Sequence, residues 1–230
     1  PTAHYFMGCV VVAPDTRTAL PGLFVAGEDA GGAHGANRLG GNGVANSTVF
    51  GGIAGDEMAL QASAQQHWAD LDETFVEAEI ERSLLPFKQP AGDVNGIRDR
   101  LLDLMWDDVG VLRDAEGLSR AQQELTGLKT ELHASGLADS NRVFNLSWHD
   151  WLKLNSLIEV SEVIAAAALS RENSRGAHYR EDYSQVGSLE DSYFTVAHSE
   201  QDQLSVERQP VVFSIVKPGE SLLEDEVVND

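Results

Sequence analysis

Three basic side chains lie in or near a glycine-rich stretch close to the start of the chain. Arg38 and His34 fall within GEDAGGAHGANRLGGNG, residues 27–43, and His4 precedes it. An arginine can hold a carboxylate through two parallel hydrogen bonds, and a histidine can add a second contact. Taken alone, each of these residues is more often an ordinary surface or core group. Together, the chemistry that they offer is the binding of an anion.

The elements expected on either side of this stretch favour that chemistry. An apolar run at 23–26 predicts a buried strand before it, and residues 44–63 can form a helix after it. Glycine lets a ligand approach the backbone, and a helix N-terminus offers unpaired N–H groups. No dinucleotide fingerprint follows a strand and no P-loop lysine is present. On spacing alone, a cofactor or anion site and a purely structural turn both stay open.

Beyond residue 63 the pattern predicts a mainly helical region. Residues 64–93 are expected to form a variable connector, and apolar residues then recur at helical spacing. We expect an antiparallel three-helix bundle over 94–171 and a C-terminal loop and strand region over 172–230. The apolar residues behind the helical prediction are Ile97, Leu101, Leu104, Met105, Leu118, Leu125, Leu128, Leu132, Leu152, Leu154, Leu157, Ile158, Val163 and Ile164. Further short strands are expected at 5–7, 9–12, 194–197 and 211–216.

Composition narrows the classes of partner. The 230 residues carry 37 acidic and 16 basic side chains, a formal net charge of −21, which disfavours nucleic acid. No apolar stretch is long enough to span a bilayer, so we expect no direct membrane span. Cys9, the only cysteine, cannot form an internal disulfide and is expected to be a small buried apolar group, which fits a reducing, cytoplasmic setting. The sequence starts at Pro1 within an expected strand, and we expect an N-terminal part to precede it.

Several motifs resemble one family of flavin enzymes. PTAHY (1–5), PGLFVAGE (21–28) and HGANRLGGNG (34–43) occur in this order, and ENSRGAHYRED (172–182) follows the helical region. They resemble the flavoprotein subunits of succinate dehydrogenase and fumarate reductase, and their relative L-aspartate oxidase. The resemblance implies that residues 1–63 are the C-terminal part of an FAD-binding domain, giving an α/β glycine-rich part followed by the helical domain.

The resemblance also implies roles for individual residues. His4 and Arg38 would bind the carboxylates of the substrate, and Glu28 would hydrogen-bond the ribityl chain of FAD. Gly43 and Val44 would face the flavin ring through backbone groups, as a helix N-terminus stabilises negative charge there. The family's catalytic proton-transfer arginine would lie upstream, so no catalytic residue is expected in this chain, and no metal ligand.

Two positions depart from the family pattern. Dehydrogenases of the family commonly have Ser-Leu-Leu after GGN, where this chain has Gly43, Val44 and Ala45. The family often has glycine where this chain has Cys9. Both departures leave the exact substrate open.

The implied activity is hydride transfer between flavin and a dicarboxylate such as succinate or fumarate. The implied partners are the missing N-terminal part and an iron–sulfur protein, which would place the chain in the cytoplasm or peripherally on the inner membrane, in electron transport or the tricarboxylic acid cycle. An L-aspartate oxidase-like enzyme, a tricarboxylate-oxidising relative and a non-catalytic helical scaffold are alternatives.

In the segment 174–182, Arg175 and His178 are expected to cap the third helix and pin the tail, or else to line the site.

Overall fold

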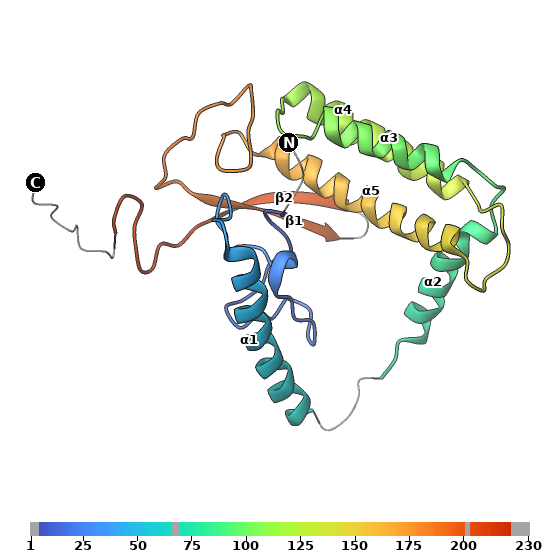
Figure 1. Cartoon of the computed structure of the whole chain (residues 1–230), viewed down its shortest axis with the longest axis horizontal. Helices are drawn as coiled ribbons and strands as arrows, with labels where there is room; N and C mark the ends of the chain where they lie inside the picture. The colour runs from blue at the N-terminus through green and yellow to red at the C-terminus, as the bar shows by residue number, and fades with distance from the viewer. Residues whose placement is uncertain (1–4, 66–69, 201–202, 222–230) are drawn as a thin grey trace, which may run out of the picture.

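The computed structural model of the chain describes residues 5–65, 70–200 and 203–221 (Figure 1). The chain is mainly helical in this part, with one small two-stranded sheet. In chain order, the elements are η1 (Gly27–Asp29), α1 (Asn42–Ala64), α2 (Glu73–Leu84), η2 (Leu85–Phe87), α3 (Val94–Asp107), α4 (Ala115–Ala134), α5 (Leu146–Ser170), β1 (Tyr193–Glu200) and β2 (Gln203–Pro210).

The hydrophobic core lies among α3, α4 and α5, which run side by side in Figure 1. These helices lie where the apolar spacing predicts them, because residues three and four apart share one helix face. A polar residue caps the start of each one: the side chains of Asp93, Asp114 and Asn145 accept backbone N–H groups of the first turn. The fully buried members of the core include Ile97, Leu101, Leu118, Leu125, Leu132, Trp151, Leu154 and Ile158.

The expected connector over 64–93 contains a helix that the sequence pattern did not predict. Helix α2 begins after Asp72, whose carboxylate accepts the N–H groups of Thr74 and Phe75 at 3.0 and 3.2 Å. No residue of α2 is buried. The helix therefore lacks the buried apolar stripe by which α3, α4 and α5 are recognised, and its cap is the signal that was missed.

The sheet also differs from the expectation. Strand β1 includes the predicted residues 194–197 and pairs antiparallel with β2, from Tyr193 opposite Pro210 to Glu200 opposite Gln203. The strand predicted at 211–216 is wrong, because the chain has already left the sheet there. Most of β2 is polar and exposed, so pairing with β1 and not apolar content selects it.

The strands predicted at 5–7, 9–12 and 23–26 are likewise not formed. This part makes only single bridges, Val10 with Ala30 and Arg17 with Phe24. A strand needs a neighbour along its length to satisfy its backbone groups, and the described residues supply none there. Apolar side chains of this region, such as Val11 at 59% exposed, consequently face outward.

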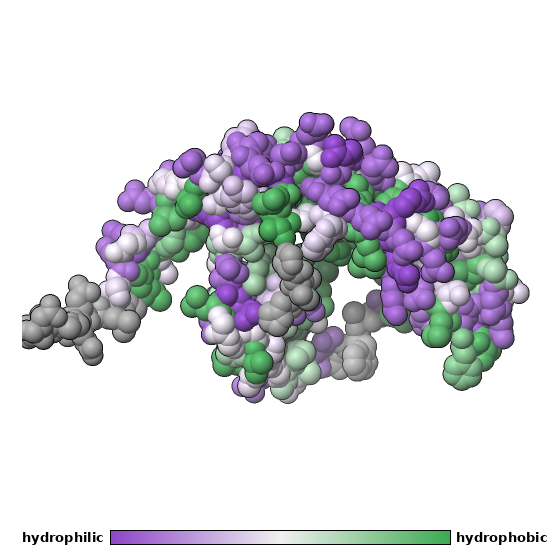
Figure 2. All heavy atoms as spheres, turned by 45° about the horizontal axis from the view of Figure 1, so that its top comes forward, coloured by the Kyte–Doolittle hydropathy of each residue, from purple (hydrophilic) through white to green (hydrophobic). Residues whose placement is uncertain are grey.

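Helix α1 stands away from the other helices in Figure 1 and buries only Asn46 and Ala54. A side-chain carbon built at Gly51, Gly52 or Gly55 would meet nothing within 4 Å among the described residues. No described residue therefore packs closely against these glycines. On the face shown in Figure 2, hydrophilic side chains spread over the helical part of the molecule, in keeping with the excess of acidic residues.

Candidate functional site

Arg38 lies on the ring of Tyr5 beside the start of α1. Its guanidinium carbon is 4.5 Å from the ring centroid, a cation–π contact that holds the side chain in place. Nη1 donates to the carbonyl of Leu39 at 3.1 Å, and the backbone N–H points to the sulfur of Met7 at 3.3 Å. Nε is buried with no hydrogen-bond partner in the described part of the chain. A buried donor without a partner is rare in a folded protein, and a bound ion or ligand is one explanation for it.

His34 packs edge-on against the same tyrosine, with ring centroids 5.4 Å apart. Its Nε2 lies 2.9 Å from Nδ2 of Asn46, and this amide nitrogen also donates to the carbonyl of Gly27 at 3.1 Å. The carbonyl fixes the orientation of the amide, so Nε2 of His34 accepts and its proton is assigned to Nδ1. Oδ1 of Asn46 and the hydroxyl of Tyr5 are buried without partners among the described residues.

The N-terminus of α1 adjoins this group. Gly41, in the left-handed region at φ 84°, precedes the helix; no side chain caps the helix start, and no acidic residue lies in its first turn. The first N–H groups of a helix have no partner within the helix and carry partial positive charge. A carbon added at Gly43 would lie 3.0 Å from the ring of Tyr5, so a larger residue would disturb the tyrosine. Val44 is 77% exposed.

Glu28 contacts the residue that follows Tyr5, and Cys9 lies four positions after Tyr5 in the chain. Oε1 of Glu28 accepts the N–H of Phe6 at 2.7 Å, so this carboxylate fixes the backbone next to the tyrosine. Burial raises the pKa of the Cys9 thiol to about 11, and the charges of Asp29 and Glu28 add to the shift. A thiol with a raised pKa is a poor nucleophile near neutral pH. Cys9 was predicted to be buried, and it is half-buried.

The structure thus brings Arg38, His34 and Gly43 together around Tyr5. His4 lies outside the described residues. Sequence reasoning missed Tyr5 and Asn46, although Tyr5 closes the PTAHY motif and was available as a signal. Asn46 gives no signal in the sequence, because an asparagine on a helix is usually exposed.

These groups fit an anionic ligand beside FAD. Three of the four buried side-chain atoms that lack partners in the described part belong to Tyr5, Arg38 and Asn46. The uncapped start of α1 offers N–H donors to an anionic group, and the absence of a side chain at Gly43 leaves room for the ring of Tyr5. Although the net charge of the chain is −21, an arginine and a helix N-terminus, both positive, lie together at this point.

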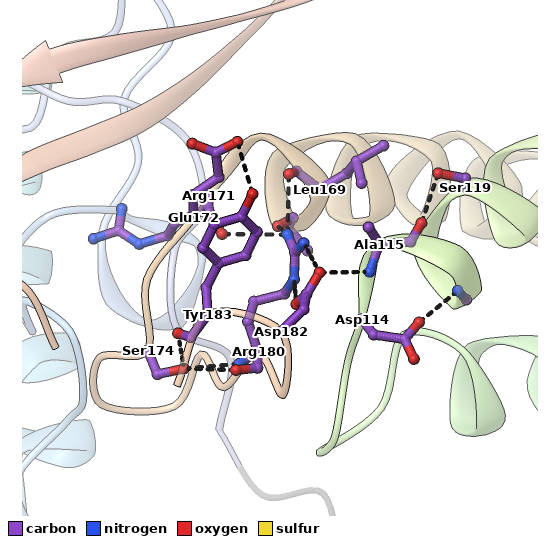
Figure 3. A network of polar contacts seen from close by, with 12 residues as sticks. Asp114, Ala115, Ser119, Leu169, Arg171, Glu172, Ser174, Arg180, Asp182 and Tyr183 are labelled. Carbon is purple, nitrogen blue, oxygen red and sulfur yellow. Dashed lines mark hydrogen bonds and ion pairs between the residues drawn. The ribbon is translucent and has the colours of Figure 1, made fainter. Parts of the chain in front are cut away.

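The segment 174–182 forms a second polar network, drawn in Figure 3. The buried guanidinium of Arg180 donates to the carbonyls of Ala168 and Leu169 at 3.1 and 3.0 Å. It also pairs with Asp182, which accepts the N–H of Ala115 at the start of α4. This segment does cap the third helix, α5, but Arg180, which was not predicted to do so, makes most of the contacts.

Of the two residues predicted to cap α5, His178 contacts its C-cap residue Arg171, whereas Arg175 contacts later residues. Arg175 donates to the carbonyls of Val186 and Ser188 and to the hydroxyl of Ser192, so it pins the following segment, as expected. The carbonyl of Arg171 lies 3.3 Å from Nε2 of His178, and Arg113 Nη1 lies 2.8 Å from Nδ1. Because arginine can only donate, Nδ1 accepts and Nε2 carries the proton. Burial and the charge of Arg113 lower the pKa of His178 to about 4.

Two sequence models match the chain. The model described as fumarate reductase flavoprotein C-term matches residues 98–222, and the model described as FAD binding domain matches residues 1–44. These matches define the class: a flavoprotein whose cofactor is FAD. More narrowly, the chain belongs to the fumarate reductase and succinate dehydrogenase flavoprotein family, of FAD-dependent oxidoreductases.

Named relatives agree with this assignment. Over 197 residues, 80% of the chain, it is 36% identical to the 8-methylmenaquinol:fumarate reductase flavoprotein subunit of Wolinella succinogenes, covering 31% of that protein. Over 226 residues, 95% of the chain, it is 32% identical to the fumarate reductase flavoprotein subunit of Haemophilus influenzae, covering 37% of that protein. The chain thus spans about a third of the length of these relatives.

Solved structures share the fold. Mycobacterium smegmatis Sdh1 in complex with UQ1 superposes with a TM-score of 0.84 at 33% identity, covering 90% of this chain and 35% of the other. A quinol fumarate reductase FrdA variant of E. coli gives 0.88 at 28%, covering 95% and 38%. Among the described residues, no cluster of three or more candidate side chains is placed to hold a metal ion, and no helix is long and apolar enough to cross a bilayer.

Proposed function

We propose that the chain supplies the carboxylate-binding and flavin-facing part of an FAD-dependent oxidoreductase that interconverts a dicarboxylate such as succinate and fumarate. The observation that carries the proposal is the position of Arg38. It lies against Tyr5 with a buried Nε that has no hydrogen-bond partner among the described residues, next to a helix start that has no acidic residue.

In this function Arg38 binds one carboxylate of the substrate. Its planar fork can make two charge-assisted hydrogen bonds, and Tyr5 limits its rotation, so less ordering is needed on binding. His4 is proposed to hold a second carboxylate contact, and Nδ1–H of His34 is oriented by Asn46. Anchoring the substrate at its carboxylates fixes the carbon atoms that react.

The flavin, when bound, accepts or supplies the hydride. Glu28 would bind the ribityl chain, and the N–H groups of Gly43 and Val44 would stabilise negative charge at the ring. The N–H groups in the first turn of α1 can take this role because they have no partner within the helix, whereas the N–H groups of later turns are already paired. The proton-transfer group is proposed to lie in the N-terminal part that is expected to precede Pro1.

We propose that the chain has four parts. Residues 1–63 complete an FAD-binding domain, 64–93 connect it through α2, 94–171 form an antiparallel three-helix bundle, and 172–230 form the loop and strand region. We further propose that the partner is an iron–sulfur subunit, which would pass electrons onward in electron transport or the tricarboxylic acid cycle. The protein would then be cytoplasmic or peripheral on the inner membrane through its partners.

Substitution of Arg38 tests the proposal in the full-length protein. Losing two charge-assisted hydrogen bonds of roughly 1.5–3 kcal/mol each should lower kcat/KM for the dicarboxylate by at least about 10²-fold in Arg38→Ala. Arg38→Lys should recover only part, because lysine lacks the fork. Steady-state rates with succinate, fumarate and L-aspartate would be measured on FAD-loaded protein.

Arg82→Ala is the matched control, since Arg82 makes an exposed pair with Glu79 far from the glycine loop in sequence. It should retain the unmodified rate. Full activity in Arg38→Ala would support the scaffold alternative and end the assignment. Turnover with L-aspartate but not with succinate or fumarate would instead indicate the oxidase relative.

A further inference from the structure

The turn at residues 175–178 touches the glycine loop two residues before Arg38. The N–H of Ala177 donates to the carbonyl of Ala36 at 3.0 Å. Gly176 lies in the left-handed region, at φ +56°, and a side-chain carbon there would overlap the same carbonyl oxygen, far inside van der Waals contact. That oxygen belongs to the backbone, which cannot swing aside as a flexible side chain can. The contact therefore requires glycine at position 176.

This turn is itself held on both sides. The N–H groups of Arg175 and His178 donate to each other's carbonyls at 2.9 and 3.0 Å. Beneath the turn, the hydroxyl of Ser174 donates to the carbonyl of Tyr183 at 2.9 Å and accepts the N–H of Arg180 at the same distance. Figure 3 shows this serine and Arg180 joined below the end of α5.

His178 ties the turn to the helical region. Its ring lies between the guanidinium of Arg113, which follows α3, and the carbonyl of Arg171, which follows α5. Arg113 in turn is fixed by hydrogen bonds from its Nε to the carbonyls of Val109 and Gly110 at 2.9 and 2.8 Å. A continuous set of contacts thus runs from the packed helices through the turn to Ala36.

We propose that the turn 175–178 is a positioning element for Arg38: by fixing the carbonyl of Ala36 through Gly176 and Ala177, it sets where the guanidinium meets the substrate carboxylate. The inference rests on the proposed function of Arg38. It adds that the helical region controls affinity for the dicarboxylate through this turn. In this proposal Gly176, Ala177 and His178 are positioning residues, which act on the substrate only through Ala36 and Arg38.

Gly176→Ala in the FAD-loaded full-length protein tests it. The added carbon must displace Ala36, and a shift of this order at a reacting group can cost up to about 10²-fold. We expect the Kd for malonate, followed by the flavin spectrum, and the KM for the dicarboxylate to rise at least about tenfold. The FAD content should stay at the level of the control.

Gly187→Ala is the matched control. Gly187 is also left-handed, at φ +74°, but a carbon there meets only Nη2 of Arg175, at 3.6 Å. Both variants thus carry similar backbone strain, and only one pushes on Ala36. Equal malonate affinity in the two variants would overturn the proposal. So would a loss of FAD and of thermal stability in Gly176→Ala with unchanged malonate affinity in the fraction that keeps FAD.

A second variant covers the case in which Gly176→Ala does not fold. His178→Ala adds no atoms and removes the contact with Arg113, and it should also raise the Kd for malonate; an unchanged Kd would count against the turn. Arg38→Ala separates this inference from the function on which it rests. If Arg38→Ala leaves malonate binding intact, the proposed function fails; if only the Arg38 variant weakens binding, the positioning role alone fails.

Discussion

At the scale of single residues, the sequence identifies the charged group and the structure supplies its surroundings. Arg38 stands out because it lies in a glycine loop before a helix, a local pattern that spacing reveals. Tyr5 lies 33 positions earlier, and its stacking under the guanidinium depends on how the two segments meet. The same holds for Asn46, which becomes visible only when its amide is seen to join His34 and Gly27.

His178 makes the stability of the protein depend on pH. Its pKa is lowered from 6.5 to about 4 in the folded protein, so between these values the unfolded chain binds a proton that the native one excludes. The contribution is therefore complete above pH 6.5 and is lost as pH falls toward 4. His178→Gln keeps one acceptor and one donor but does not titrate, so its unfolding temperature should fall less between pH 7 and 5.

Thermal unfolding at several pH values checks this expectation. His149→Gln, at an exposed position on α5, serves as the control and should follow the unmodified protein. Parallel curves for His178→Gln and the unmodified protein would show that His178 is not the source of the acid sensitivity.

At the scale of elements, buried apolar periodicity was the reliable signal. It located α3, α4 and α5, since their core residues recur on one face. It failed for α2, which buries nothing, and for β2, which is mostly exposed. Apolar content alone also predicted strands at 5–7, 9–12 and 23–26. These predictions failed because a strand forms only where a neighbouring strand is present to pair with it.

Asn145 is the cap whose loss should cost most. Its Oδ1 accepts the N–H of Trp148 at 3.0 Å, while Nδ2 donates to the carbonyls of Asp139 and Asn141 at 3.0 and 2.7 Å. Asn145→Ala removes all three bonds at a residue that is 4% exposed, and should destabilise by about 2–3 kcal/mol. The measurements are thermal unfolding and hydrogen exchange at the first turn of α5.

Asp93→Ala provides the comparison for this cap. Asp93 accepts one N–H, of Gly96, at an exposed helix start, so its loss should cost only about 1 kcal/mol. If the two variants unfold at the same temperature, the additional bonds of Asn145 contribute nothing.

At the scale of the whole molecule, the acidic surface and the site have opposite charge. A net charge of −21 repels anionic ligands in general, so the local field at Arg38 and the start of α1 must exceed it. Composition predicted the acidic net charge. The local positive field depends on how residues from separate segments meet, which composition does not encode.

The chain expressed by itself should not retain FAD. The FAD-binding match covers only residues 1–44, and the candidate flavin contacts are limited to Glu28, Gly43 and Val44. So few contacts leave little free energy after the loss of translational freedom. The absorbance of the purified chain near ~450 nm, where oxidised flavin absorbs, should be well below one FAD per chain. Stoichiometric absorbance there would contradict the prediction.

The packing at position 176 also limits which variants of this protein can exist. The clash with Ala36 comes from the side-chain carbon nearest the backbone, an atom that every amino acid other than glycine possesses. In a library with all substitutions at position 176, every variant should therefore be disfavoured, and the chemical similarity of a residue to glycine should not predict how well its variant is tolerated. At Gly35, where such a carbon meets nothing within 4 Å, only the backbone angle would select, so asparagine and aspartate should survive best.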